Sequence, residues 1–164
     1  MKLYNFIMIG AIMLFFGKSN VLAQDFNKGL VAYNLGDYDT ALEEWKPLAE
    51  MGNSFAQHKL GYMYKTGKGI PLDYGGAVIW YHLAAIQGNA SAQSNLGFMY
   101  KTGKGVPQDF LQSYMWYELA DINGHKDAKK WLHNVSRKMT APNIEKAQKM
   151  ASKCIDRSYK NCGW

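Results

Sequence analysis

Apolar residues recur at intervals of three and four along most of the chain, and short segments rich in Gly, Asn and Pro separate these runs. In residues 25–53, one such run carries its apolar residues at Ala41, Leu42, Trp45, Leu48 and Ala49. This spacing is typical of one face of an amphipathic helix. Gly36-Asp37 before the run and Gly52-Asn53 after it are typical of helix ends, since Gly suits the left-handed position past a helix C-terminus. The pattern predicts two helices in this segment.

Residues 54–125 contain one pattern twice. Each copy reads Ala-Gln-x-x-Leu-Gly-x-Met-Tyr-Lys-Thr-Gly-Lys-Gly-x-Pro-x-Asp, and a Trp-Tyr pair follows. Leu60 and Leu96 hold the same place in the two copies, so the period is 36 residues. A fixed period of this length is the signature of stacked helical repeats.

Each copy is predicted to form two helices joined by a loop. In the first copy Ala56, Leu60, Gly61 and Tyr64 fall on one face of the first helix. Two glycines and Pro71 then prevent simple continuation of the helix. Asp73, and Asp109 in the second copy, are predicted to cap the second helix of each pair.

The last segment, residues 126–164, follows a different pattern without a Gly-rich loop. It predicts one helix over residues 126–138 and another over roughly 141–156, started by Thr140-Ala141-Pro142. An atypical end unit is expected, because a terminal repeat has no next neighbour to cover it. The chain is therefore predicted to be an all-α solenoid with repeats at 25–53, 54–89 and 90–125 and a C-terminal capping unit at 126–164.

Composition supports a packed protein. Of its 164 residues 48% are hydrophobic and 14% aromatic, which argues against disorder. The net charge of +6 is unevenly distributed. Seven Lys and Arg stand against ten Asp and Glu from Gln24 to His125, but ten stand against three from Lys126 to Trp164. The basic character belongs to the last segment.

The N-terminus has the pattern of a secretory signal. Lys2 supplies a positive charge, residues 6–16 form an uncharged apolar run too short to span a bilayer, and Val21-Leu22-Ala23 suits a cleavage site before Gln24. The prediction is a signal peptide at residues 1–23 and a periplasmic or secreted protein. An uncleaved anchor is the alternative, and no Cys follows the site to carry a lipid.

Two cysteines, Cys154 and Cys162, lie close together near the C-terminus. In an exported chain such a pair favours a disulfide. Two free thiols are the alternative, and too few further ligands lie near for a metal site.

The Ala-x-x-x-Leu-Gly-x-Met-Tyr helix, the Gly-x-Gly-Val/Ile-Pro-x-Asp loop and the Trp-Tyr-x-x-Ala helix together resemble the Sel-one-like repeat family, which is tetratricopeptide-like. The resemblance is specific over Ser54 to His125 and covers nearly all of the chain after the predicted signal. It implies a right-handed stack of about four antiparallel helix pairs. It also implies protein–protein contacts, often as an adaptor of the bacterial envelope. The family's cysteine-rich, penicillin-binding branch differs, because Cys is absent here from Gln24 to Lys153.

No motif points to catalysis, a cofactor or a metal. Thr66-Gly67-Lys68 and its repeat lack the first Gly and the Ser or Thr of a phosphate-binding loop. His58, His82, His125 and His133 show no metal-ligand spacing. There is no Gly-x-Ser-x-Gly nucleophile motif. The sequence therefore predicts a protein that is not an enzyme.

In a stack of this kind the first helix of each pair lines the concave face. The positions expected there form an aromatic row flanked by cations, and the residues chosen are Tyr33, His58, Tyr62, Lys65, Phe98, Lys101 and Arg137. Aromatic and Arg side chains are frequent interface anchors. The alternative is that Tyr62 and Phe98 pack between repeats as core.

The basic C-terminal unit is open to two interpretations. It could receive an acidic partner or an anionic membrane surface, or its Lys and Arg residues could form a solvated polar face. Nucleic acid is excluded by the predicted export.

The function predicted is non-catalytic binding of a protein or peptide in the concave groove. One alternative is an immunity or inhibitor protein that neutralises an exported toxic enzyme. A weaker one, from the cysteine-rich branch alone, is a cell-wall or β-lactam hydrolase.

Overall fold

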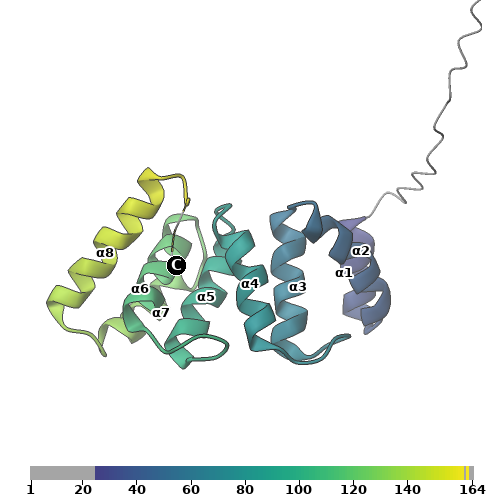
Figure 1. Ribbon diagram of the computed structural model, residues 1–164, viewed down its shortest axis with the longest axis horizontal. Helices are drawn as coiled ribbons and strands as arrows, with labels where there is room; N and C mark the ends of the chain where they lie inside the picture. The colour runs from purple at the N-terminus through teal and green to yellow at the C-terminus, as the bar shows by residue number, and fades with distance from the viewer. Residues whose placement is uncertain (1–24, 161, 163–164) are drawn as a thin grey trace, which may run out of the picture.

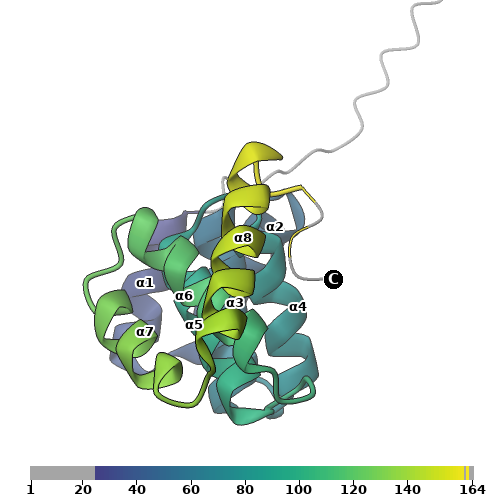
Figure 2. The same ribbon diagram turned by 90° about the vertical axis from the view of Figure 1, so that its left-hand side faces the viewer.

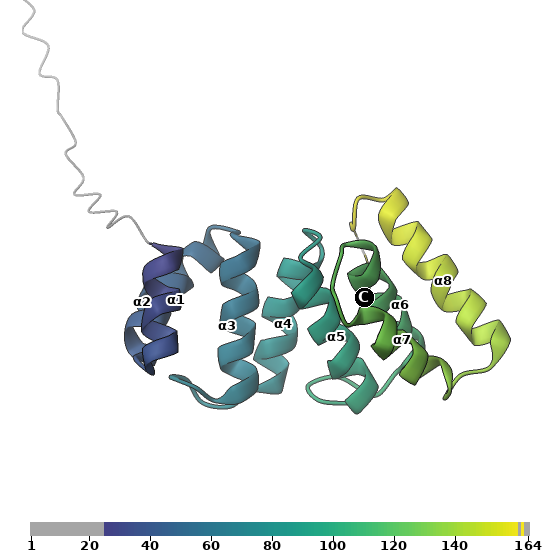
Figure 3. The ribbon, with the colours of Figure 1, turned by 180° about the vertical axis from the view of Figure 1, so that it is seen from behind.

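The computed structural model of the protein describes residues 25–160 and 162. This part of the chain contains eight α-helices and no strand. They are α1 (Phe26–Leu35), α2 (Tyr38–Glu50), α3 (Ser54–Thr66), α4 (Tyr74–Ala85), α5 (Ala90–Thr102), α6 (Phe110–Ile122), α7 (Ala128–Ser136) and α8 (Ala141–Asp156). The helix pairs α1–α2, α3–α4 and α5–α6 follow one another along the long axis of the molecule, and α8 lies at the far end (Figure 1); the view from behind shows the same arrangement (Figure 3). The predicted all-α solenoid is confirmed, whereas the predicted signal peptide at residues 1–23 lies outside the described residues.

Short polar side chains begin most of the helices. Asp109 precedes α6 and accepts hydrogen bonds from the backbone N–H groups of Leu111 and Gln112, as predicted. Asp73 holds the same position before α4, but its side chain makes no capping hydrogen bond. At the other end of α3 and α5, Gly67 and Gly103 adopt the left-handed conformation that ends a helix.

A glycine in each of the first three units lets the two helices of a pair approach closely. A Cβ atom on Gly61 would lie 2.8 Å from the Tyr81 ring, and one on Gly97 would lie 2.8 Å from the Tyr117 ring. Gly29 of α1 faces Trp45 in the same way. Each of these rings is almost fully buried. The repeated Leu-Gly pair of the sequence is therefore a contact surface for an aromatic ring of the following helix.

Glutamine side chains join consecutive units. Gln57 Nε2 donates to the carbonyl of Ala49, 3.0 Å away, and Gln93 Nε2 donates to the carbonyl of Ala85 at the same distance. One helix further on, Gln87 donates to Gln57 Oε1 and Asn123 donates to Gln93 Oε1. Both glutamines are buried, and these bonds satisfy their polar atoms. The 36-residue period thus repeats a hydrogen-bonding scheme as well as a packing scheme.

The C-terminal unit packs differently from the repeats before it. α7 and α8 both pack against α6, rather than α8 packing on α7 as the second helix of a pair would. Tyr114, Tyr117, Val135 and Ala147 form the small core that joins these three helices. α8 has the predicted bounds, whereas α7 is shorter than predicted at both ends because residues 126–127 and 137–138 form turns.

Candidate functional site

Three adjoining hollows run along the side of the molecule formed mainly by α1, α3, α5 and α7, and together they are called the groove below. Seen along the long axis, α1 and α7 lie on one side, while α2, α4 and the C-terminal tail lie on the other (Figure 2). The first hollow, of about 420 Å³, is lined by Tyr33, Asn34, Trp45, His58, Lys59, Tyr62, Ser91, Ser94, Asn95 and His125. The second, of about 280 Å³, is lined by Lys65, Ser94, Asn95, Phe98, Lys101, Tyr117 and Trp131. The third, of about 720 Å³, is lined by Lys101, Gln108, Phe110, Asn134, Arg137 and Lys138.

The structure brings all seven residues chosen from the sequence to this groove. Tyr33, His58 and Tyr62 lie in the first hollow. Lys65, Phe98 and Lys101 lie in the second, which shares Ser94 and Asn95 with the first. Arg137 lies in the third, which shares Lys101 with the second. The positions expected on the concave face therefore form one continuous surface.

The aromatic row is partly exposed and partly structural. Tyr33 and Tyr62 meet edge to face, with their ring centres 6.3 Å apart. Tyr62 is 36% exposed. Tyr33 packs against the N-terminal core, and Phe98 packs against both the central and the C-terminal cores. Tyr62 is therefore the ring most available to a ligand, whereas Phe98 supports the solenoid as well as lining the groove.

A chain of hydrogen bonds crosses the groove from α3 to α5. Lys65 Nζ donates to Asn95 Oδ1, 2.9 Å away, and Asn95 Nδ2 donates to His58 Nε2, 3.1 Å away. Asn95 Nδ2 also donates to the backbone carbonyl of Ser91. Burial, assisted by the positive charges of Lys59 and Lys65, lowers the pKa of His58 to about 4. His58 is therefore neutral at pH 7, and its Nε2 can accept the bond from Asn95.

The groove is positively charged. Its three linings contain Lys59, Lys65, Lys101, Arg137 and Lys138, but no Asp or Glu. The pKa of the Lys65 ammonium is lowered, mainly by burial and to a smaller extent by the nearby charge of Lys104. Lys59, Lys65 and Lys101 belong to repeats whose net charge is negative, yet no acidic residue of these repeats lines the groove.

Sequence reasoning missed several residues of the groove, among them Asn95 and Trp131. Lys65 contacts Asn95, and Lys101 Nζ lies 5.2 Å from the centre of the Trp131 ring. Asn95 and Trp131 are one period apart, as are Lys65 and Lys101. The period therefore relates the two contacts, but it does not by itself show that the neighbouring first helices touch through these side chains.

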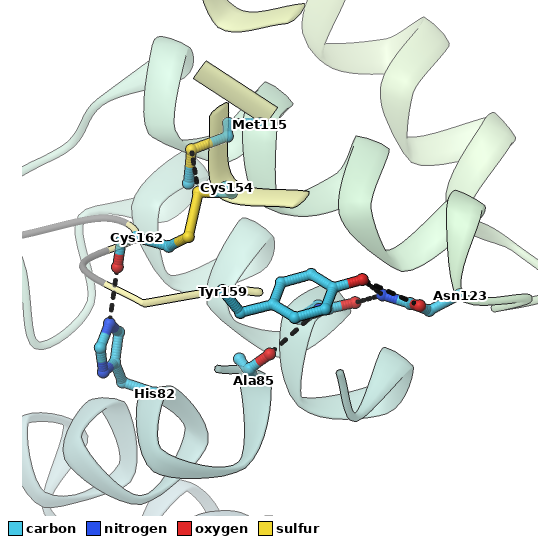
Figure 4. The surroundings of a disulfide bond; sticks show 8 residues. His82, Ala85, Met115, Asn123, Cys154, Tyr159 and Cys162 are labelled. Atoms are coloured by element: carbon cyan, nitrogen blue, oxygen red, sulfur yellow. Dashed lines mark hydrogen bonds between the residues drawn. A yellow bond between two sulfur atoms is a disulfide. The ribbon is translucent and has the colours of Figure 1, made fainter. Parts of the chain in front are cut away.

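A disulfide joins Cys154 of α8 to Cys162 of the tail, with their Cα atoms 5.4 Å apart (Figure 4). His82 Nε2 donates to the carbonyl oxygen of Cys162, 2.8 Å away. The Tyr159 hydroxyl exchanges hydrogen bonds with the side chain of Asn123. The tail is thereby held against α4 and α6, on the side away from the groove.

Metal sites and membrane-spanning helices are absent from the part of the chain that the structure describes. No group of three or more His, Cys, Asp or Glu residues there is arranged to hold a metal ion. None of the helices described combines the length and apolar character needed to cross a bilayer.

A stack of helix pairs with a continuous concave groove defines a helical-repeat scaffold. The chain belongs to the Sel1 repeat family. The family model described as Sel1 repeat matches residues 54–89 and 90–120. No curated protein matches the sequence.

Two solved structures give the same assignment. A Sel1 repeat protein from Oxalobacter formigenes is 37% identical, with a TM-score of 0.61, and the match covers 70% of this chain and 89% of that one. A protective antigen of uropathogenic Escherichia coli strains that displays an SLR fold is 28% identical, with a TM-score of 0.76 over 81% of this chain. This chain spans 30% of the Escherichia coli protein. Sel1-repeat proteins are generally protein-interaction modules, and their fold is typically a non-catalytic scaffold.

Proposed function

We propose that this protein is a non-catalytic adaptor of the bacterial cell envelope that binds a protein or peptide partner in its groove. The observation that carries the proposal is the groove itself. Tyr33, Tyr62 and Phe98 form its aromatic row, and Lys65, Lys101 and Arg137 flank that row. Aromatic and basic side chains in a preformed hollow are the residue types that most often supply binding energy at protein interfaces.

A preformed surface favours binding because little has to be ordered when a partner arrives. Asn95 fixes the position of Lys65, and Lys65 Nζ lies 4.8 Å from the centre of the Tyr62 ring. The most exposed aromatic ring of the row is therefore adjacent to a positioned cation. We expect Tyr62 to contribute more to binding than to stability.

The test compares two exposed side chains on opposite sides of the solenoid. Tyr62 of α3 lines the groove, whereas Leu83 of α4 is similarly exposed, at 38%, and lines none of the three hollows. Wild type, Tyr62→Ala and Leu83→Ala would be used to capture partners from envelope extract, and the affinity for the purified partner would then be measured. Tyr62→Ala is expected to weaken binding about 30-fold, which corresponds to roughly 2 kcal/mol, and to leave the melting temperature nearly unchanged.

Leu83→Ala should bind like wild type. A partner retained by Tyr62→Ala and lost by Leu83→Ala would place the binding surface on the opposite side. A large drop in melting temperature for Tyr62→Ala would show that this ring belongs to the core.

The proposed location is the periplasm or the exterior, after cleavage behind Ala23. The N-terminal pattern supports it, and so does the Cys154–Cys162 disulfide, since disulfides persist in oxidising compartments. Intact-mass measurement of the fractionated protein tests this directly. A chain that starts at Gln24 in the envelope fraction is expected, and a full-length chain in the cytoplasmic fraction would contradict export.

A further inference from the structure

Three lysine side chains lie around the Phe98 ring, and two of them, Lys65 and Lys101, line the second hollow. The Nζ atoms of Lys65, Lys101 and Lys104 lie 5.8, 5.7 and 5.9 Å from the centre of the Phe98 ring. They come from α3, from α5 and from the loop after α5. Any two of these ammonium groups are therefore at most about 12 Å apart, and the positive charge of Lys104 acts on Lys65.

No carboxylate of the described chain neutralises this cluster. The two ion pairs in residues 25–160 and 162 are Lys28 with Glu44 and Lys149 with Glu145, and neither is in the groove. The ring face of Phe98 attracts cations only weakly, by about 0.5–2 kcal/mol. The charge of Lys104 therefore continues to act on Lys65 in the unbound protein, and a bound anion would relieve this repulsion.

Lys65 is also positioned in advance. Lys65 uses one of its three N–H donors on Asn95 Oδ1, and Asn95 is held in turn by His58 and by the Ser91 carbonyl. The remaining donors of Lys65 are left for another acceptor. An ammonium that is already fixed and partly removed from water binds an anion at a smaller entropic cost than a mobile surface lysine does.

We propose that the groove recognises an acidic peptide in extended conformation, with its carboxylates seated on Lys65 and Lys101, beside which Lys104 adds a third positive charge. The inference rests on the proposed function and specifies the chemistry of the partner. An extended chain advances about 3.3 Å per residue, so acidic residues two to four positions apart reach neighbouring ammonium groups. Arg137 and Lys138 continue the positive charge into the third hollow.

The shape of the site favours a peptide over an anionic membrane. Phe98 and Lys101 line a hollow of about 280 Å³ that opens between α3, α5 and α7. A flat bilayer surface contacts the rim of such a hollow, whereas a peptide chain enters it.

The test uses two fluorescein-labelled dodecapeptides in which every third residue is Glu or Gln and the others are Ala and Tyr. Fluorescence anisotropy would measure their affinity for the exported protein at low and moderate salt. The Glu peptide is expected to bind at least ten-fold more tightly than the Gln peptide, and this advantage should shrink as salt rises.

Matched double variants locate the charge. Lys65→Met/Lys101→Met removes two groove charges, and Lys146→Met/Lys153→Met removes two exposed charges on α8. Both double variants remove two positive charges, so the long-range electrostatic attraction of the Glu peptide weakens to a similar extent in each. The groove variant is expected to lose at least 30-fold in affinity for the Glu peptide, and the α8 variant less than three-fold. Lys101→Met/Lys104→Met serves the same purpose if the first variant is unfolded.

The outcomes separate this inference from the proposed function. If the Glu and Gln peptides bind equally well and Tyr62→Ala weakens the binding of both, the acidic specificity is overturned while binding in the groove stands. If the groove variant and the α8 variant lose affinity for the Glu peptide to the same extent, the site does not lie at Lys65 and Lys101. Absence of peptide binding, with phosphatidylglycerol vesicles bound instead through the same lysines, would overturn the peptide assignment in favour of a membrane.

Discussion

The stability of the protein should depend on pH through His58, the histidine that lies under the groove between α3 and α5. Burial lowers its pKa from the ordinary value of 6.5 to about 4 in the folded protein. The folded state therefore binds fewer protons than the unfolded state between these two values. His58 contributes stability above pH 6.5, and this contribution is lost as the pH falls towards 4.

The size of the effect follows from that difference in pKa. One pKa unit corresponds to about 1.4 kcal/mol, so the whole contribution is about 3 kcal/mol, and about 2 kcal/mol of it is lost between pH 7.5 and pH 5. His58→Gln removes the titration but keeps a side chain that can accept the hydrogen bond from Asn95. The variant should lose about 2 kcal/mol less than wild type over this range.

Urea unfolding followed by circular dichroism at pH 7.5, 6 and 5 measures this difference. His82, whose pKa is also lowered by burial, is present in both proteins, so its contribution cancels. His133→Gln on the exposed side of α7 is the matched control and should follow wild type. If the curves for wild type and His58→Gln stay parallel from pH 7.5 to 5, His58 is solvated in the folded protein and the reasoning fails.

Three further predictions concern stability and are checked by thermal or denaturant unfolding. Gly97→Ala should destabilise by about 1–3 kcal/mol because its Cβ would meet the ring on α6, whereas Gly75→Ala, which faces only a flexible carboxylate, should be neutral or stabilise by up to about 1 kcal/mol. Similar effects of the two changes would contradict the packing argument. Cys154→Ser/Cys162→Ser should cost about 2–3 kcal/mol, and reductant should then have no further effect. Glu44→Gln should lower the melting temperature, since this buried carboxylate accepts hydrogen bonds from a backbone N–H and a lysine; an unchanged value would show that the charge is solvated.

The sequence predicted most of the fold because its repeat is strict. The period of 36 residues located the helices of the two central units, and the Thr-Ala-Pro segment located α8 at Ala141–Asp156. The seven residues chosen for the concave face all line one of the three hollows, since positions one period apart occupy equivalent places in a solenoid.

The sequence did not show the contacts between units, because local patterns do not encode them. The bond from Lys65 to Asn95 spans 30 residues, and the packing of α8 on α6 skips the helix between them. The hydrogen bond between His82 and the Cys162 carbonyl spans 80 residues. Such contacts depend on how far each unit is rotated against the next, and periodicity within one unit carries no information about that rotation.

The two central repeats present equivalent surfaces to their neighbours, as the paired bonds of Gln87 with Gln57 and Asn123 with Gln93 show. A third copy of the same 36 residues inserted after Asn89 would find complementary partners on both of its sides. Unequal recombination between the two copies in a gene could supply such an insertion in one event. The length of this protein's groove is therefore a property that selection can alter in whole units, without inventing a new interface each time.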